Sequence, residues 1–556
     1  MLLVITLQMD SIPTYRIKES RISAQIYNFR NEFDMNSIIY TRLREPISPF
    51  EDIGVYLVGV GGVVPSMDGL SVRGGGYMEN AIFINGIPLS GLPYRFLNFL
   101  PVDRDAIRVI RLYRGDLPAR YDGILSAVVD VETDERGNYA KVGIPNAALK
   151  VDGFYLDYFL PGLFTLNGFY WRSATSVFKR GNFSFLATGM NIRQTNILNY
   201  FYDESGNDTI YYWDDRAMTT GFSFRKRDMW AYSSLEIRIH RDSSTSEGLV
   251  SGRTYKWISG LWFQKGSFGV HLQNHVYVSP QLSDSLNSMV FERHTHMLSL
   301  YYDFGKITAG VDVLPPFRLY PLIRYANKVF LDSTRAIRFF AGTTVQPFFA
   351  WGFPFYERVI PSDRVNMGYT LIAGYEKISS PYTLEVNLFL RYFHPYYVPN
   401  PLLFGYDLPD SVIISPSMVF VDRSSISAGL DLYLNGFRGR DMSLSLTLMR
   451  SLFVDTWTPA PEDIVFSFDF QYRFINVRWI YGFVRWELVF NPENLEHNTY
   501  RESPMYIYSI MFPFQWKGFH FRIGVYNFIP QPEPSEEFSA IYRAFPIPIL
   551  SVRRDF

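Results

Sequence analysis

The sequence predicts a large antiparallel β-barrel that spans a membrane, preceded by a small strand-rich domain of mixed α/β character. Segments of roughly ten residues, the length that a tilted strand needs to cross a bilayer, alternate apolar and polar positions from about residue 139 to residue 556. Aromatic residues make up 17% of the 556 residues, as an extended lipid-facing belt requires. No apolar run reaches the ~18 residues of a transmembrane helix, so any membrane crossing must use strands.

Residues 465–474 show the alternation most clearly. Phe466 and Phe468 fall on one face of the expected strand, and Ser467 and Asp469 fall on the other. One face suits lipid and the other suits water. Because many segments repeat this pattern, it favours a closed membrane barrel over a soluble sandwich. We expect roughly 18 to 22 strands.

The connections between these segments alternate in length. Short ones such as 225–228 and 264–267 alternate with long polar ones such as 191–215, 241–253 and 279–292. Tight turns at one end and larger loops at the other are typical of membrane barrels. The barrel must close, because an open sheet edge cannot exist in lipid.

Composition excludes several functions. A formal net charge of -1 gives no electrostatic case for nucleic-acid binding, and the absence of cysteine excludes thiol chemistry and a disulfide scaffold. His271 and His275 share one strand face, as do His294 and His296, but such pairs without convergent acids or cysteines are usually structural. No nucleophile–base motif is evident. We therefore expect no enzyme activity, no metal site and no cofactor.

The stretch 70–133 differs from the rest of the chain. Short apolar runs are separated by glycine-bearing turns, and three successive glycines, Gly74 to Gly76, allow a positive φ or a close approach to another surface. Asn85-Gly86 between two apolar runs predicts a hairpin turn. The glycines do not form a phosphate loop, since no Gly-Lys-Ser/Thr follows them.

The order of these pieces resembles the plug domain of TonB-dependent outer-membrane receptors. SVRGGG, ENAIFINGIPL and DAIRVIRLYRGDLPARYDGILSAVVDVET follow one another, and the resemblance covers roughly residues 49–133. Tyr121-Asp122-Gly123 stands where the family usually has Tyr-Gly-Gly. The plug-motif residues are Arg73, Gly74, Gly75, Gly76, Asn85, Gly86, Arg111, Arg114, Gly115 and Arg120.

The resemblance implies a domain plan and a location. Residues 1–45 would form a periplasmic segment, with a possible signal remnant at its apolar start. Residues 46–136 would be the plug in the lumen, and 137–556 the barrel, for which the family favours 22 strands. The protein would lie in the bacterial outer membrane among its lipids. Phe556, a terminal aromatic, resembles the signal read by the barrel-assembly machinery.

The resemblance further implies import of a scarce small solute, driven by the TonB-ExbB-ExbD complex. The nearest TonB-box candidate is Thr14, Tyr15, Arg16 and Ile17, which lacks the usual acidic-Thr-Val-Val character; the alternative is an ordinary strand or linker. The ligand-binding candidates at the plug apex are Tyr77, Glu79, Asn80, Tyr94 and Arg95.

The plug is expected to be held by charged contacts with the barrel wall. The plug cations expected to meet wall acids are Arg73, Arg108, Arg111, Arg114 and Arg120; the alternative for each is a solvated or purely structural arginine. Two other functions stay open. One is a plugged receptor or scaffold that holds a surface partner, such as a surface lipoprotein, without transport. The other is a diffusive channel.

Overall fold

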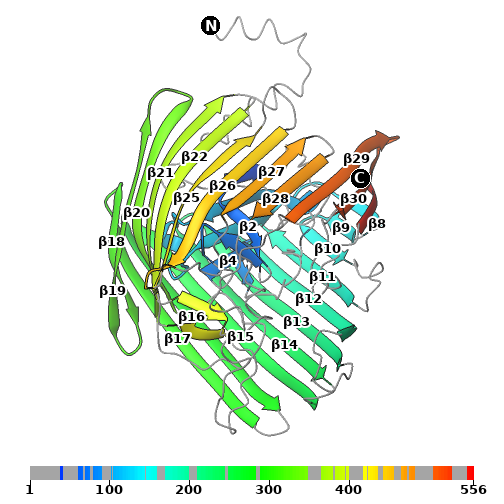
Figure 1. Ribbon diagram of the computed structural model, residues 1–556, viewed down its shortest axis with the longest axis horizontal. Helices are drawn as coiled ribbons and strands as arrows, with labels where there is room; N and C mark the ends of the chain where they lie inside the picture. The colour runs from blue at the N-terminus through cyan, green and yellow to red at the C-terminus, as the bar shows by residue number, and fades with distance from the viewer. Residues whose placement is uncertain are drawn as a thin grey trace, which may run out of the picture.

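A computed structural model gives the fold, a closed barrel that surrounds a small sheet (Figure 1). It describes residues 38–41, 61–66, 69–75, 79–89, 102, 104–144, 146–159, 169–198, 209–244, 248–283, 288–347, 365–379, 382–394, 396–399, 418–421, 424–435, 442–455, 457, 465–472, 475–481, 505–528 and 547–556. Within these ranges, no helix is both long enough and apolar enough to cross a membrane.

The inner sheet, hereafter the plug sheet, has the strand order β1-β6-β7-β4-β5. β4 and β7 are parallel, and the other pairs are antiparallel. Buried apolar residues such as Leu112, Val129 and Val131 form its core. The plug elements are β1 (Ile38–Thr41), β2 (Val63–Ser66), β3 (Gly69–Val72), β4 (Asn80–Ile84), β5 (Ile87–Leu89), η3 (Arg104–Ala106), β6 (Ile107–Arg114), η4 (Ala119–Tyr121) and β7 (Ala127–Thr133).

One strand of the plug sheet comes from the range that we assigned to the N-terminal segment. β1 pairs with β6, with Ile38 opposite Leu112 and Thr41 opposite Val109. The plug sheet therefore begins before residue 46. The division of the rest of the chain into domains stays a prediction.

The barrel comprises 22 strands of the described chain, the number that the family resemblance favoured. It closes where the last strand pairs with the first, with Val552 opposite Val142. Its strands are β8 (Tyr139–Ile144), β9 (Asn146–Val151), β10 (Phe154–Phe159), β11 (Phe169–Arg180), β12 (Phe183–Leu198), β13 (Thr209–Lys226), β14 (Met229–Ser244), β15 (Gly248–Lys265), β16 (Phe268–Ser283), β17 (Ser288–Asp303), β18 (Ile307–Leu314), β19 (Arg318–Phe330), β20 (Arg335–Pro347), β21 (Val365–Ser379), β22 (Tyr382–His394), β25 (Ser425–Asn435), β26 (Met442–Phe453), β27 (Phe466–Tyr472), β28 (Ile475–Tyr481), β29 (Met505–Trp516), β30 (Phe519–Phe528) and β31 (Ile547–Asp555). A separate hairpin pairs β23 (Tyr396–Pro399) with β24 (Met418–Val421).

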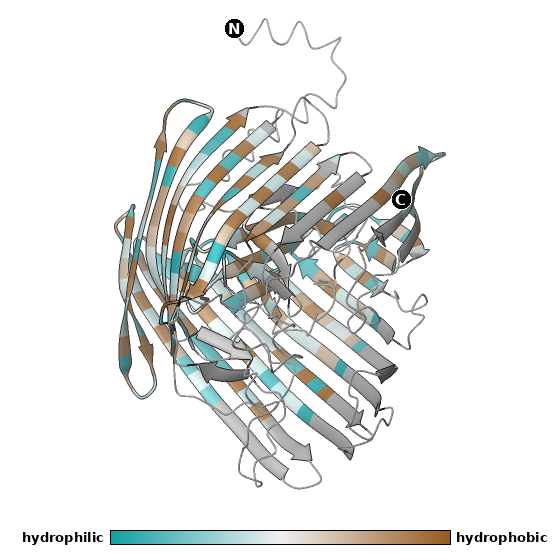
Figure 2. Ribbon diagram, viewed as in Figure 1, coloured by the Kyte–Doolittle hydropathy of each residue, from teal (hydrophilic) through white to brown (hydrophobic). Residues whose placement is uncertain are grey.

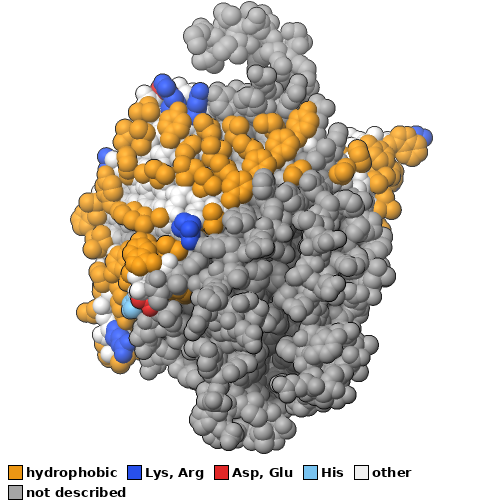
Figure 3. Space-filling view, viewed as in Figure 1, with side chains coloured by type: hydrophobic (Ala, Val, Ile, Leu, Met, Phe, Trp, Pro, Cys, Tyr) orange, Lys and Arg blue, Asp and Glu red, His pale blue; other side chains and the backbone are white. Residues whose placement is uncertain are grey.

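The two faces of the barrel wall follow the alternation in the sequence. On β22, Glu385 and Asn387 are 0% exposed on the inner face, whereas Leu388 is 56% exposed on the outer face. Apolar and polar residues alternate along the strands in Figure 2, and the described outer surface in Figure 3 is mostly hydrophobic. The inner wall therefore offers polar groups to the plug, and the outer wall offers apolar groups to lipid.

Several strands are longer than the sequence pattern indicated. Long connections were expected at 191–215, 241–253 and 279–292, but β12 to β17 extend through most of these ranges, and β13 and β15 reach 18 residues each. Beyond the bilayer both faces of a strand meet water, so the apolar–polar alternation disappears although the ladder continues. The expected short turns are present, and Gly266 and Gly518 adopt the positive φ that such turns need.

Candidate functional site

The glycine-rich element seats the plug against the barrel wall. Arg73 and Gly74 follow β3 with φ values of 49° and 80°, and the backbone folds back so that Val72 and Gly75 exchange hydrogen bonds of 2.9 and 3.0 Å. A Cβ added to Gly74 would lie 2.0 Å from Oγ of Ser427 on β25. Glycine is therefore required here for two reasons, the backbone conformation and the close approach to the wall.

Arg73 and Arg114 carry the plug's positive charge into the wall. Nε of Arg73 donates to Oδ2 of Asp431 at 2.7 Å, and Nη1 donates to the Arg114 carbonyl at 2.7 Å. Nη2 of Arg114 lies 3.0 Å from Oε2 of Glu385, and Nη1 lies 3.3 Å from Oδ1 of Asp431. All four side chains are at most 1% exposed. We call this group of four the central network.

The wall holds the acids of the central network in place. Nδ2 of Asn387 donates to Oδ1 of Asp431 at 2.7 Å, and Nη2 of Arg338 donates to Oδ1 of Asn387 at 3.0 Å. A buried carboxylate between fixed donors is already oriented for the plug cations, which lowers the cost of holding charge away from water.

Burial shapes the ionisation of plug groups beside the central network. Burial lowers the pKa of Arg73 below its ordinary value, although Asp431 opposes the shift. Burial also raises the pKa of Asp116 to about 6, against the opposing effect of the neighbouring guanidinium groups of Arg73, Arg338 and Arg114. Asp116 therefore changes charge in a range of pH where most carboxyl groups do not.

A second contact forms where the sequence departs from the family pattern. Asp122 takes φ -62° and ψ 155°, an extended conformation that any residue adopts, and the positive φ of 82° falls on Gly123. Oδ1 of Asp122 lies 2.8 Å from Nη2 of Arg324 on β19, with both side chains at most 4% exposed. The aspartate in the place of a glycine thus adds a buried ion pair between plug and wall.

A third contact joins β7 to β13. Nη1 and Nη2 of Arg225 lie 3.1 and 2.9 Å from the two carboxylate oxygens of Asp130, and the Tyr121 hydroxyl donates to Oδ2 at 2.8 Å. Burial alone would raise the pKa of Asp130, but Arg225 and Arg111 outweigh it and hold the pKa below its ordinary value. Asp130 is therefore a charged carboxylate in a bidentate ion pair with Arg225.

A fourth contact lies at the barrel seam, where β8 pairs with β31. Asp105 of η3 lies 2.7 Å from Nη1 of Arg553 on β31 and 3.2 Å from Nη2 of Arg522 on β30. Nζ of Lys141 on β8 lies 3.7 Å from the same carboxylate. One plug carboxylate therefore contacts the first strand and the last two strands of the barrel. We call this group the seam contact.

Aromatic packing supports the plug between these charged contacts. The Asn85-Gly86 turn is present between β4 and β5, with φ values of 51° and 78°. Nε1 of Trp230 on β14 donates to the Gly86 carbonyl at 2.9 Å, and the Trp230 ring lies 5.1 Å from the ring of Phe83. The hairpin tip is thus held by an indole that leaves no room for a side chain at Gly86.

The comparisons with known proteins agree at the level of structure. No family model matches the sequence, and no curated protein matches it. Among solved structures, the siderophore receptor PirA from Pseudomonas aeruginosa is 13% identical, with a TM-score of 0.56 over 94% of this chain and 99% of PirA. The FrpB iron transporter from Neisseria meningitidis is 10% identical, with a TM-score of 0.59 over 93% and 99% of the two chains. The ferric yersiniabactin uptake receptor FyuA from Yersinia pestis is 11% identical, with a TM-score of 0.60 over 94% and 98%.

The chain has the fold of a TonB-dependent outer-membrane receptor. The similar structures are receptors and transporters rather than enzymes, in agreement with the sequence analysis. At 10 to 13% identity they establish the plug-and-barrel architecture and leave the solute open.

The plug cations that were expected to meet wall acids fall into two groups, one that contacts the wall and one that contacts other plug residues. Arg73 and Arg114 reach wall acids, as expected. Arg108 and Arg111 instead pair with Glu132 of the plug itself, and Nη2 of Arg120 donates to the Tyr113 hydroxyl at 2.7 Å.

Sequence reasoning missed the plug acids. Asp105, Asp122 and Asp130 each pair with a wall arginine. At three of the four contacts the plug therefore supplies the acid and the wall supplies the cation, the reverse of our expectation. A signal was present for two of them. Asp122 replaces a family glycine, and Asp130 interrupts an apolar run.

The structure locates some of the proposed recognition residues of this receptor fold. Glu79 is buried, and its carbonyl accepts from Ser126 N at 2.8 Å, while Asn80 opens β4 and is half-buried. Phe556 is 65% exposed, and its backbone N–H donates to the Asn138 carbonyl at 3.1 Å. Gly76, Tyr77, Tyr94, Arg95 and the TonB-box candidate at 14–17 lie outside the described residues.

Among the described residues, no group of three or more His, Cys, Asp or Glu side chains is arranged to hold a metal ion. His271 and His275 face inward and are buried, whereas His294 and His296 are exposed on the outer face of β17.

Proposed function

We propose that the protein imports a scarce small solute across the outer membrane, with the plug as the gate and the TonB-ExbB-ExbD complex as the source of energy. The observation that carries the proposal is the plug sheet inside a closed barrel, attached by four groups of ion pairs and by buried apolar contacts such as that of Phe83 with Trp230. When the plug moves, the charged groups of both surfaces regain hydration, which offsets part of the cost of breaking their ion pairs.

The solute class that the comparisons favour is an iron chelate. PirA is named as a siderophore receptor, and FyuA as a ferric yersiniabactin uptake receptor. The residues proposed to contact the solute are Tyr77, Glu79, Asn80, Tyr94 and Arg95, which belong to polar and aromatic segments that flank plug strands. Aromatic rings and a guanidinium group suit a flat, oxygen-rich chelate.

The coupling step is tested by binding. A peptide covering residues 1–53 is titrated against the periplasmic domain of the host's TonB protein, and a peptide with Tyr15→Pro and Ile17→Pro serves as the control. Saturable binding that the prolines abolish supports energised transport through the segment at 14–17, because strand addition needs the backbone N–H groups that proline lacks. No binding by either peptide contradicts coupling through this segment.

One observation favours a second function. The segment at 14–17 lacks the acidic-Thr-Val-Val character of a TonB box, as a plugged scaffold that holds a surface lipoprotein without transport would allow. The two functions differ in TonB binding. A diffusive channel differs from both in conductance, since a plugged barrel of either kind stays closed in a planar bilayer and a diffusive channel conducts without a trigger.

A further inference from the structure

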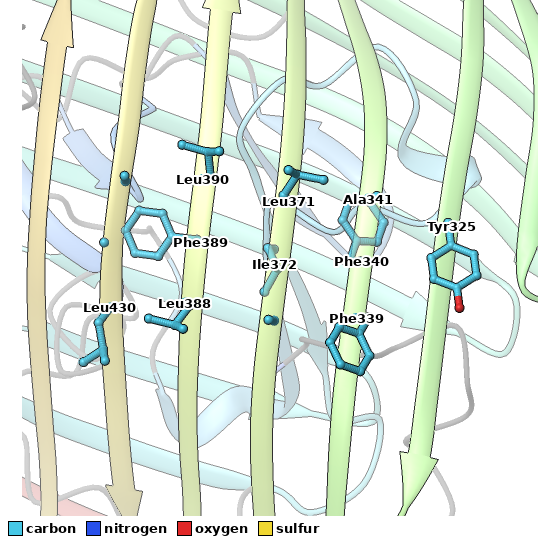
Figure 4. Close-up of a pocket in the computed structure, with 13 residues that line it drawn as sticks. Tyr325, Phe339, Phe340, Ala341, Leu371, Ile372, Leu388, Phe389, Leu390 and Leu430 are labelled. Atoms are coloured by element: carbon cyan, nitrogen blue, oxygen red, sulfur yellow. The ribbon is translucent and has the colours of Figure 1, made fainter.

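A depression of about 860 Å³ lies in the outer wall of the barrel, across β19 to β22 and β25. Figure 4 shows its side chains on neighbouring strands, with Tyr325 at one end and Leu430 at the other. The rim is apolar and exposed, with Leu371 at 51% and Leu388 at 56%. The small residues Ala341, Ala373 and Ala428 among the larger ones lower the surface between them.

The depression follows the register of the sheet. Ala428 pairs with Leu390, Leu390 with Leu371, Leu371 with Ala341, and Ala341 with Tyr325. This is one row of outward-facing residues at right angles to the strands, so the depression is a groove that crosses strands. We call it the outer groove.

A cation stands at one end of the same row. Arg450 on β26 lies directly opposite Ala428 in the ladder, and its side chain is exposed on the outer face. It follows Leu446 and Leu448 on that face and lies three residues before β26 ends at Phe453. This end of β26 adjoins the longer connections of the barrel, at the level where a long basic side chain can reach the lipid headgroups.

The dimensions of the outer groove fit one leaflet of a bilayer. From Arg450 to Tyr325 the row takes five steps between strands, which at ~4.8 Å a step is about 24 Å. Strands of such barrels tilt by about 45°, so a row at right angles to them descends by roughly 17 Å. Half of a ~30 Å hydrocarbon core is ~15 Å. The groove therefore runs from headgroup level to near the bilayer centre.

We propose that the outer groove binds a membrane lipid with a phosphate headgroup, with the phosphate on Arg450 and one acyl chain along the groove toward Tyr325. A guanidinium group makes charge-assisted hydrogen bonds to phosphate oxygens, and an apolar channel of this length matches a chain that lies in one leaflet. The bound lipid is a fixed part of the receptor's surface, distinct from the lipids that exchange around the rest of the wall. This inference does not depend on what the protein transports.

The test uses the purified full-length protein in detergent, stripped of lipid and titrated in native mass spectrometry. The main probe is dipalmitoyl phosphatidic acid. Dipalmitoylglycerol supplies the same chains without the phosphate, and dihexanoyl phosphatidic acid supplies the phosphate with short chains. We expect one high-affinity site for the main probe and at least tenfold weaker binding of each of the other two.

Two variants and two matched controls place the site. Arg450→Gln removes the cation, and Ala373→Trp fills the groove; each is expected to weaken binding of the main probe about tenfold. Arg172→Gln and Ala174→Trp make the same changes at exposed positions of β11, on the opposite side of the barrel order, and are expected to leave binding unchanged. Heat-sensitive migration on gels confirms that each variant is a folded barrel.

Each other outcome overturns the proposal. Equal affinity in all five proteins means that the lipid binds without a defined site. Equal affinity for dipalmitoylglycerol removes the role of Arg450, and equal affinity for dihexanoyl phosphatidic acid removes the role of the groove.

Discussion

Removal of the negative charge of Asp431 is expected to loosen the plug. Asp431→Asn keeps the shape of the side chain but leaves the buried cations Arg73 and Arg114 without the carboxylate that lies 2.7 and 3.3 Å from them. Loss of one partner from a buried ion pair costs about 3 to 5 kcal/mol. For a domain of the plug's size, with a urea dependence of about 1 kcal/mol per molar, the midpoint of plug unfolding is expected to fall by about 3 to 5 M.

The assay is the conductance of single barrels in a planar bilayer during a urea titration, in which an unfolded plug opens the pore. The matched control is Glu236→Gln, since Glu236 on β14 lies opposite Lys256 on β15 and both are buried wall residues away from the central network. The control is expected to keep the wild-type midpoint. The double variant Arg73→Met with Asp431→Asn is expected to recover part of the loss, because one buried cation is removed with its partner. An unchanged midpoint for Asp431→Asn in a folded barrel would refute the role assigned to the central network.

Three further variants test other contacts by the same conductance assay. Asp122→Gly restores the family residue and removes the ion pair with Arg324, so the midpoint of plug unfolding is expected to fall by about 2 M. Partial recovery is expected when Arg324→Met is added. An unchanged midpoint would contradict a role of this pair in plug retention. Gly74→Ala is expected to prevent seating of the plug, since the new Cβ would lie 2.0 Å from Oγ of Ser427 at a φ of 80°. A pore that stays closed like the wild type would show that the close approach of Gly74 to the wall is not needed. Asp116, with its pKa raised from 3.8 to about 6, keeps a proton in the folded plug that the unfolded chain releases, so plug stability falls as pH rises from about 4 to 6. Asp116→Asn is expected to abolish this fall and to stabilise the plug at pH 7 by about 3 kcal/mol. An unchanged dependence of plug stability on pH would contradict the raised pKa.

The barrel could be predicted from the sequence because its physical cause is local. A strand with lipid on one side and a polar lumen on the other must alternate, and residues 466–469 already show which side chains face inward: Ser467 and Asp469 are at most 4% exposed. The ends of the strands could not be predicted in the same way. Where β13 and β15 leave the bilayer, the solvent is water on both faces and the pattern carries no information about the ladder.

The partners of the charged side chains could be predicted less well, because they are set by contacts between residues far apart in the chain. Arg73 and Asp431 are separated by 358 positions, and nothing near either residue specifies the other. Arg111 shows the resulting error: its expected wall acid is replaced by Glu132 on the neighbouring plug strand, at 2.6 Å. A sequence shows that a charge will be buried, and only the fold shows which charge balances it.

The seam contact has a consequence for the order of assembly. Lys141 comes from the first barrel strand, and Arg522 and Arg553 come from the last two, so these three basic side chains meet only when the chain is complete and the barrel closes. Like charges repel at such distances in a medium of low polarity, and the carboxylate of Asp105 between them turns this repulsion into attraction. A plug segment already in position would therefore favour the final pairing of β31 with β8. We therefore expect closure around an occupied lumen to be favoured over closure around an empty one.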